Sequence, residues 1–400
     1  MPRPAPARVV VPVPVFVFAA ALAAQGPPAS AQPRPVMAIG SVAHPREALA
    51  ATAPAAAATI GRGLAWLLAQ QRPDGRWDSD AVSPDAGRPV YDVAVTGLAL
   101  LALAREGTAA RPEPRHDAML RGAHWLALQQ QENGLLGTKA THDFIYGHAI
   151  ATFALAAVTA ATGSAEARQA LGGGITYLAA HRNPFMVWRY MPRDGDNDTS
   201  VTAWATMACL AARELGLPVD ENGLASVRGY LAQVTDAHGR AGYTRAGEPS
   251  SRQVQSAQRF PPANGEAMTA AAIWCRHALG ADAADAQLAA GAALLLAKPP
   301  SWEPDAGKVD LCYWFFAGEA LRRVGAPAAR TPWDQQLIAA LQQGQRLDGE
   351  VAGSWDPRDP WGEDGGRLYS TALAVLALQA LYDVPALTAA AAPAQAPAPK

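Results

Sequence analysis

An internal repeat is the feature of this sequence that most constrains its fold. The stretch RGLAWLLAQQ at 62–71 recurs as RGAHWLALQQ at 121–130, and Gly75 and Gly134 follow the two copies at the same distance. Self-similarity at a fixed spacing is the signature of a repeat architecture. A length of 400 residues would allow two or three unrelated domains, but the repeat favours one array of similar units.

Two kinds of helix alternate along this array. Ile60, Leu64 and Leu67 form an apolar stripe that predicts an amphipathic helix, whereas 93–104 is apolar nearly all round and must be buried on every side. The amphipathic helices are predicted near 60–71, 118–131, 166–180, 223–234, 283–297 and 334–344. The apolar helices are predicted near 92–105, 147–161, 199–214, 266–279, 310–324 and 369–382. Six such pairs predict an all-α, α6/α6 toroid with the apolar helices inside; a straight solenoid would expose them along one edge.

The two ends of the chain differ in composition from this array. Arg3 and Arg8 precede the apolar run 9–24, and Ala29-Ser30-Ala31 is a small-x-small cleavage site, which together predict a signal peptide over 1–31. The alternative is a membrane anchor, although the run is short and contains prolines. We expect an exported protein, periplasmic or extracellular, that is not an integral membrane protein after cleavage.

The remaining boundaries follow from Ala/Pro-rich stretches and from charge. We expect a flexible segment over 32–57, the repeat domain over 58–385 and a disordered tail over 386–400. The 33 Lys and Arg residues balance 35 Asp and Glu residues, so a nucleic-acid partner is not expected.

The repeat resembles a known superfamily. Gln70 and Gln71 with Gly75 and Trp77 are similar to the repeat of squalene–hopene cyclases and protein prenyltransferase β subunits. A looser copy combines Gln342, Gln343, Gly353 and Trp355. The stretches 198–201, 310–314, 353–357 and 366–373 resemble uncharacterised exported bacterial members. The resemblance spans about 58–385 and implies an α/α toroid, on which the superfamily hosts several chemistries.

In this superfamily, terpene cyclisation uses an Asp-x-Asp-Asp motif whose aspartic acid protonates an alkene. Asp194-Gly195-Asp196-Asn197-Asp198-Thr199 stands at the matching place. In one alignment Asn197 replaces the proton donor; in the other Asp196 is the donor, with Asp194 and Asp198 beside it. Asp198 is also placed to cap the following helix. Trp204 is among the aromatic residues that would line a cavity for cationic intermediates.

Two other chemistries of the superfamily lack necessary residues. Prenyltransferases bind zinc through Asp-x-Cys and a later His; Asp310 and Cys312 match, but Ser370 stands where the His should follow Tyr369. We therefore expect no metal and no cofactor, unless His148 lies across the ring. A thioester would need Cys and Gln around Glu266, and neither is present.

Function is expected at one end of the ring, where every outer helix leads into an inner helix. That end gathers polar residues over aligned helix N-termini. The binding candidates there and just below are His148, Glu266, Asp310, Cys312, Tyr313, Trp204 and Tyr369. The insert 244–263 is either a lid or a tolerated insertion.

Two functions stay open at this point. The first is a non-catalytic or unassigned binding module that takes a lipid, a glycan or a polypeptide. The alternative is a class II terpene cyclase-like isomerase that uses Asp196. A polysaccharide lyase or hydrolase would need a groove of clustered carboxylates, for which we find no pattern.

Overall fold

Helices alternate between an outer and an inner layer in the computed structural model, which describes residues 44–82, 86–107, 113–253, 256–282 and 285–382. The outer helices are α2 (Pro54–Ala69), α4 (Pro114–Leu128), α6 (Ala165–His181), α8 (Glu221–Val234), α10 (Ala286–Leu296) and α12 (Pro327–Gly344). The inner helices are α3 (Asp92–Ala104), α5 (Phe144–Thr162), α7 (Thr199–Glu214), α9 (Ala267–Ala278), α11 (Leu311–Val324) and α13 (Gly362–Gln379). The predicted alternation is therefore confirmed, and the boundaries differ by a few residues.

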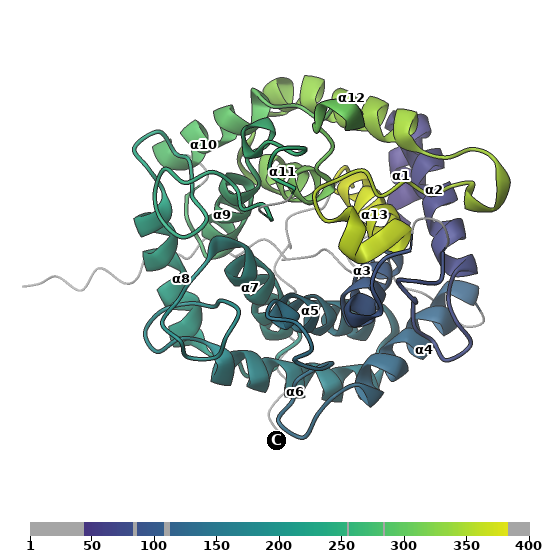
Figure 1. Ribbon diagram of the computed structural model, residues 1–400, viewed down its shortest axis with the longest axis horizontal. Helices are drawn as coiled ribbons and strands as arrows, with labels where there is room; N and C mark the ends of the chain where they lie inside the picture. Colours follow the sequence, from purple (N-terminus) through teal and green to yellow (C-terminus); the bar gives the residue numbers. More distant parts are fainter. Residues whose placement is uncertain (1–43, 83–85, 108–112, 254–255, 283–284, 383–400) are drawn as a thin grey trace, which may run out of the picture. The chain divides into compact units, whose positions relative to one another are not determined.

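The layers close on themselves within the unit Pro33–Lys400. Each inner helix packs against the next one, and α13 packs back against α3, while the outer helix α12 packs against α2 (Figure 1). Burial explains the closure, because nearly every residue of α3 from Val95 to Ala104 is covered. The result is the α6/α6 toroid predicted from the repeat.

The residues that recur in the repeat hold the turns after the outer helices in place. The indole Nε1 of a tryptophan in each of three connections donates to a carbonyl near the end of the preceding outer helix: Trp77 to Leu67 (2.7 Å), Trp188 to Leu178 (2.8 Å) and Trp355 to Leu341 (2.7 Å). Gly75 has a φ of 100°, and a Cβ there would lie 2.3 Å from the Arg121 carbonyl oxygen, so glycine is required.

A glutamine joins the turns at Gly75, Gly134 and Gly353 to the next outer helix. The Gln71 side-chain amide donates to the carbonyls of Gly75 and Ala118, and the Gln130 amide donates to those of Gly134 and Ala170. In the last pair Gln345 has this role, bonding Gly353 and Thr59, where we expected Gln342 or Gln343. The isolated bridge between Gln345 and Trp355 sets the register that sequence spacing missed.

The segment before the ring is more ordered than expected. Helix α1 (Pro45–Thr52) lies inside the stretch 32–57 that we expected to be flexible, and α2 begins at Pro54. Leu49 is buried in the core and Arg46 donates to Glu106 at 2.8 Å, which explains the order. The predicted signal peptide 1–31 and tail 386–400 lie outside the described residues.

Short 3₁₀ helices occur in the connections that lead to inner helices. They are η1 (Pro89–Tyr91), η2 (Pro262–Asn264), η3 (Pro304–Ala306) and η4 (Gly349–Val351). Among the described residues, α5 is the one helix long and apolar enough to cross a membrane, and most of it is buried inside the ring.

Candidate functional site at the loop end of the ring

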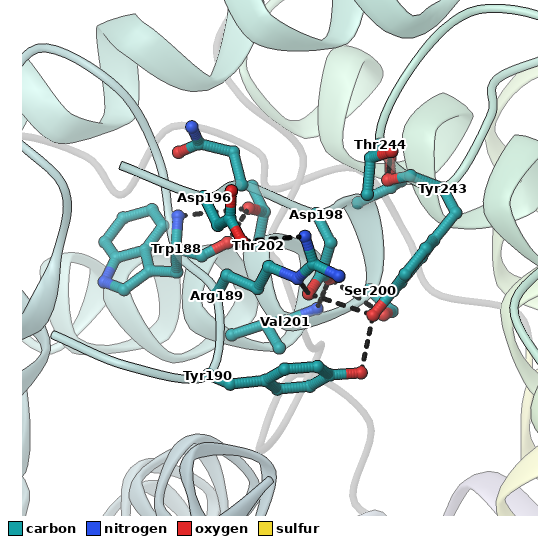
Figure 2. Close-up of polar contacts among 12 residues, drawn as sticks. Trp188, Arg189, Tyr190, Asp196, Asp198, Ser200, Val201, Thr202, Tyr243 and Thr244 are labelled. Carbon is teal, nitrogen blue, oxygen red and sulfur yellow. Dashed lines mark hydrogen bonds and ion pairs between the residues drawn. The ribbon is translucent and has the colours of Figure 1, made fainter. Parts of the chain in front are cut away.

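Asp198 is a buried carboxylate at the start of α7. Its Oδ1 accepts hydrogen bonds from the Val201 backbone N–H (2.8 Å) and the Ser200 hydroxyl (2.9 Å), so it caps the helix as predicted. Its Oδ2 accepts from the Tyr243 hydroxyl at 3.3 Å (Figure 2). Burial raises the pKa of Asp198 to about 6, because these bonds and the nearby Arg189 offset only part of the desolvation.

Arg189 lies over two tyrosine rings beside this carboxylate. Its guanidinium carbon is 5.3 Å from the Tyr190 ring centre and 5.4 Å from that of Tyr243. The two tyrosine hydroxyls are 2.5 Å apart, which joins both rings into one frame (Figure 2). The guanidinium comes no closer than 3.4 Å to Asp196 and 3.8 Å to Asp198. The Arg189 guanidinium therefore lies against two aromatic rings and has only long ion-pair contacts.

Side chains from α5 and from the loop before it extend this group. The Tyr146 hydroxyl is 2.5 Å from the Ser200 hydroxyl, and the Tyr146 and Tyr190 rings are 6.1 Å apart. The exposed His142 packs edge-on against Tyr190 at 5.0 Å. Tyr146, Tyr190 and Tyr243 are all partly exposed. We call Tyr146, Arg189, Tyr190, Asp198, Ser200 and Tyr243 the tyrosine site.

The structure places Asp194 and Asp196 outside this buried group. Both are exposed on the loop before α7, and the Asp196 side chain is 70% exposed. Asp194 Oδ1 accepts from the Asp196 backbone N–H at 3.0 Å, which only shapes the loop. A carboxylic acid that protonates an alkene needs apolar surroundings, so this position gives Asp196 no support as a proton donor.

Asp310, Cys312 and Tyr369 do come together, in a second group at the starts of α11 and α13. Asp310 caps α11 through the Tyr313 backbone N–H (2.8 Å) and accepts from the buried Arg252 at 2.5 Å. Tyr369 donates to the buried Asp359 at 3.3 Å. Burial and the nearby Asp310 carboxylate raise the pKa of Asp359 to about 7. Arg252 belongs to the insert 244–263, which therefore packs onto the ring.

Other predicted binding residues have structural partners. Glu266 accepts from Arg240 (2.8 Å) and Lys298 (2.7 Å); burial opposes ionisation, but these bonds outweigh it and hold the pKa of Glu266 below its usual value. Tyr313 is buried, and its hydroxyl donates to the Leu295 and Lys298 carbonyls.

His148 lies within the core of the second pair. Its Nδ1 accepts from the Leu136 N–H (3.0 Å), and its Nε2 lies 3.1 Å from the Gly174 carbonyl oxygen. Burial lowers the pKa of His148 to about 3. Both ring nitrogens are occupied, so His148 does not complete a zinc site with Cys312. In the described part of the chain, no three His, Cys, Asp or Glu side chains are grouped to hold a metal ion.

Trp204 lies deeper in the ring, within a closed aromatic cluster. Its ring stacks on Phe315 at 5.6 Å and meets Phe316 edge-on at 5.3 Å, and Phe315 and Phe316 are 5.0 Å apart. All three side chains are buried. They pack against one another. Cys209 and Cys275 are buried free thiols.

Sequence reasoning missed Arg189, Tyr190 and Asp359. The signal for Arg189 was its place beside Trp188, because Arg76 stands beside Trp77 and also approaches the acid of its inner helix, Asp92, at 3.5 Å. Asp359 carries no local pattern, since it belongs to an irregular turn before α13.

Comparison with known proteins identifies the fold. No protein-family model and no curated protein matches this sequence. A variant of the type II terpene cyclase MstE from Scytonema, in complex with merosterolic acid A, has a TM-score of 0.54, with 16% identity over 82% of this chain and 97% of that chain. An inactive α-1,6-mannanase variant of Salegentibacter, in complex with α-1,6-mannotriose, has a TM-score of 0.55, with 10% identity over 80% and 97%. An α-amylase from Clostridium perfringens has a TM-score of 0.52, with 9% identity over 81% and 98%.

These likenesses agree with the toroid fold predicted from the repeat, since a type II terpene cyclase has a similar fold. The same fold also carries glycosidases, so the choice of function rests on the residues of the site.

Proposed function

We propose that this protein is a non-catalytic binding module that takes a glycan at the tyrosine site. One observation carries the proposal: the partly exposed Tyr190 and Tyr243 lie against the guanidinium of Arg189, and the partly exposed Tyr146 lies beside Tyr190. Sugars offer hydroxyls that pair with such donors and acceptors, and C–H faces that pack on aromatic rings.

The aromatic cluster below the site favours a glycan over a lipid. A hydrocarbon ligand needs an apolar space that excludes water. Trp204, Phe315 and Phe316 fill one another's contact surfaces, which leaves them little free surface for a lipid chain. The polar groups lie above this cluster, at the ends of helices where sugar hydroxyls reach them.

A labelled full-length chain applied to a glycan array tests the proposal. We expect binding to a defined set of glycans and a loss of about tenfold or more in affinity for a Tyr190→Phe, Tyr243→Phe double variant, because two hydroxyls are removed. Tyr177→Phe is the matched control, since the Tyr177 hydroxyl has no hydrogen-bond partner among the described residues. Equal binding by all three proteins would contradict the site.

The second candidate function is terpene cyclisation, which one observation favours at Asp198 in place of Asp196. Asp198 has no exposed surface, and burial raises its pKa to about 6, so it holds a proton more readily than an ordinary carboxyl. Gas chromatography of squalene incubated with the protein decides between the two. Cyclic products lost in Asp198→Asn would replace the glycan proposal with catalysis.

A further inference from the structure

We infer that the ligand of the tyrosine site is an acidic glycan whose carboxylate binds Arg189. The inference rests on the proposed function and names the class of sugar: a uronate-containing oligosaccharide. It comes from the contrast between Arg189 and the other arginines at this end of the ring.

Two of those other arginines are paired with carboxylates of the chain itself. Arg240 donates to both oxygens of Glu266, with a shortest distance of 2.8 Å. Arg252 donates to Asp310 at 2.5 Å. Charge-assisted hydrogen bonds of this length occupy the guanidinium fork, so these arginines have no room for a ligand.

Arg189 makes no comparable bond. Within the residues that the structure describes, its side chain has ion-pair contacts to Asp196 and Asp198, at 3.4 and 3.8 Å, and no hydrogen bond. Its Nε is buried and faces Asp198 Oδ2 at 3.8 Å without a hydrogen bond. The side chain is 24% exposed, and its terminal amino groups are the donors that a ligand carboxylate would take.

Neither neighbouring carboxylate can move to within hydrogen-bond distance of Arg189 at low cost. Asp198 is held by its cap to Val201 and Ser200, with Tyr243 on its other oxygen, so moving it toward Arg189 would break those bonds. Asp196 is 70% exposed, and exposed ion pairs contribute about 0–1 kcal/mol. Asp196 is therefore a weak internal competitor that a ligand carboxylate can displace.

The frame around Arg189 favours a planar anion that is part of a sugar. Tyr190 and Tyr243 hold the guanidinium from two sides, which fixes the orientation of its fork before the ligand arrives. The Tyr146 and Ser200 hydroxyls, which bond each other, belong to the same site and offer partners for the hydroxyls of the same sugar. A uronate carries both groups on one ring.

Isothermal titration calorimetry tests the inference with tetrasaccharides of galacturonate, mannuronate and guluronate and with their carboxyl-reduced, neutral counterparts. We expect at least one acidic tetrasaccharide to bind about tenfold or more tightly than its reduced form, because the bond to Arg189 is charge-assisted. Arg189→Met should remove that difference, so that the acidic tetrasaccharide and its reduced form bind alike.

Asp196→Asn supplies a readout that a structural role would not give. It removes the internal competitor from an exposed loop, so the affinity for the acidic tetrasaccharide should rise about threefold, within the range of an exposed ion pair. Asp194→Asn is the matched control: it makes the same charge change on the same loop, and its effect should be smaller.

Each remaining outcome separates the two proposals. Equal binding of acidic and reduced forms, or an unchanged affinity in Asp196→Asn, overturns the inference and leaves the glycan site standing. Binding of no tetrasaccharide, together with a blank glycan array, overturns both.

Discussion

The starts of α7 and α11 each carry a buried capping aspartate, but the two aspartates have different charged partners. Asp198 and Asp310 are both buried, and each caps its helix by accepting a backbone N–H at 2.8 Å. Asp310 also accepts a hydrogen bond from Arg252, whose side chain is only 4% exposed. Asp198 has Arg189 at 3.8 Å and is surrounded by tyrosine hydroxyls instead. The same cap is thus paired with a close arginine at the start of α11 and has no arginine as close at the start of α7.

Replacing the arginines should give the largest contrast between the two places. Arg252→Met leaves Asp310 as an unpaired buried charge and should lower the free energy of unfolding by about 3–5 kcal/mol. Arg189→Met breaks only loose pairs and should lower it by less than about 1 kcal/mol. Urea unfolding followed by circular dichroism measures both, and equal losses would show that Arg189 is also a structural residue.

The pH dependence of stability should mark Asp198. Its folded pKa of about 6 lies above the usual aspartate pKa of 3.8, so the folded state binds the proton more tightly than the unfolded state. Stability from this group therefore rises as pH falls from about 6 to about 4, by about 3 kcal/mol at most.

The difference between wild type and Asp198→Asn isolates this contribution. Asp359, whose pKa burial raises to about 7, acts with the same sign but cancels in the comparison. We expect the wild type to gain on the variant between pH 7 and pH 4 in urea unfolding. A difference that stays flat over this range would mean that Asp198 is solvated.

Amide replacement of the two caps should give the smallest contrast. Asparagine caps helices about as well as aspartate. Asp310→Asn keeps the cap but leaves Arg252 unpaired, and should cost about 2 kcal/mol at pH 7. Asp198→Asn should cost less than about 1 kcal/mol under the same conditions. The reverse order in urea unfolding would assign the stronger ion pair to Asp198.

The fold could be predicted from the sequence because it depends on patterns that repeat. Helices with one apolar stripe alternate with helices that are apolar all round, and this alternation predicts the two layers. Trp77 and Gly75 mark the turns. Helix α1 escaped prediction because an Ala/Pro-rich stretch looks flexible until its one buried leucine, Leu49, has a surface to pack on.

The site was harder to predict because it depends on distances between loops. Asp198 was found as a cap, but Tyr243, which donates to it, comes from the connection after α8, and Arg189 and Tyr190 approach it only because their loop folds back. Asp196 matched a catalytic motif, but spacing along a loop does not say which carboxylate turns inward. His148 looked like a free histidine and is a core hydrogen-bonding residue.

Gln345 ties the end of the array to its beginning, since its amide bonds the Thr59 carbonyl. During synthesis the first inner helix therefore lacks one of its two inner neighbours until the final pair leaves the ribosome. An open row of repeats tolerates trimming, because a terminal unit has only one interface to lose. Here every pair has two, so deleting any one breaks the circle in two places and leaves apolar flanks on both sides. New joining points between pairs, with the old ends linked, keep all six interfaces and should be tolerated far better than any shortening.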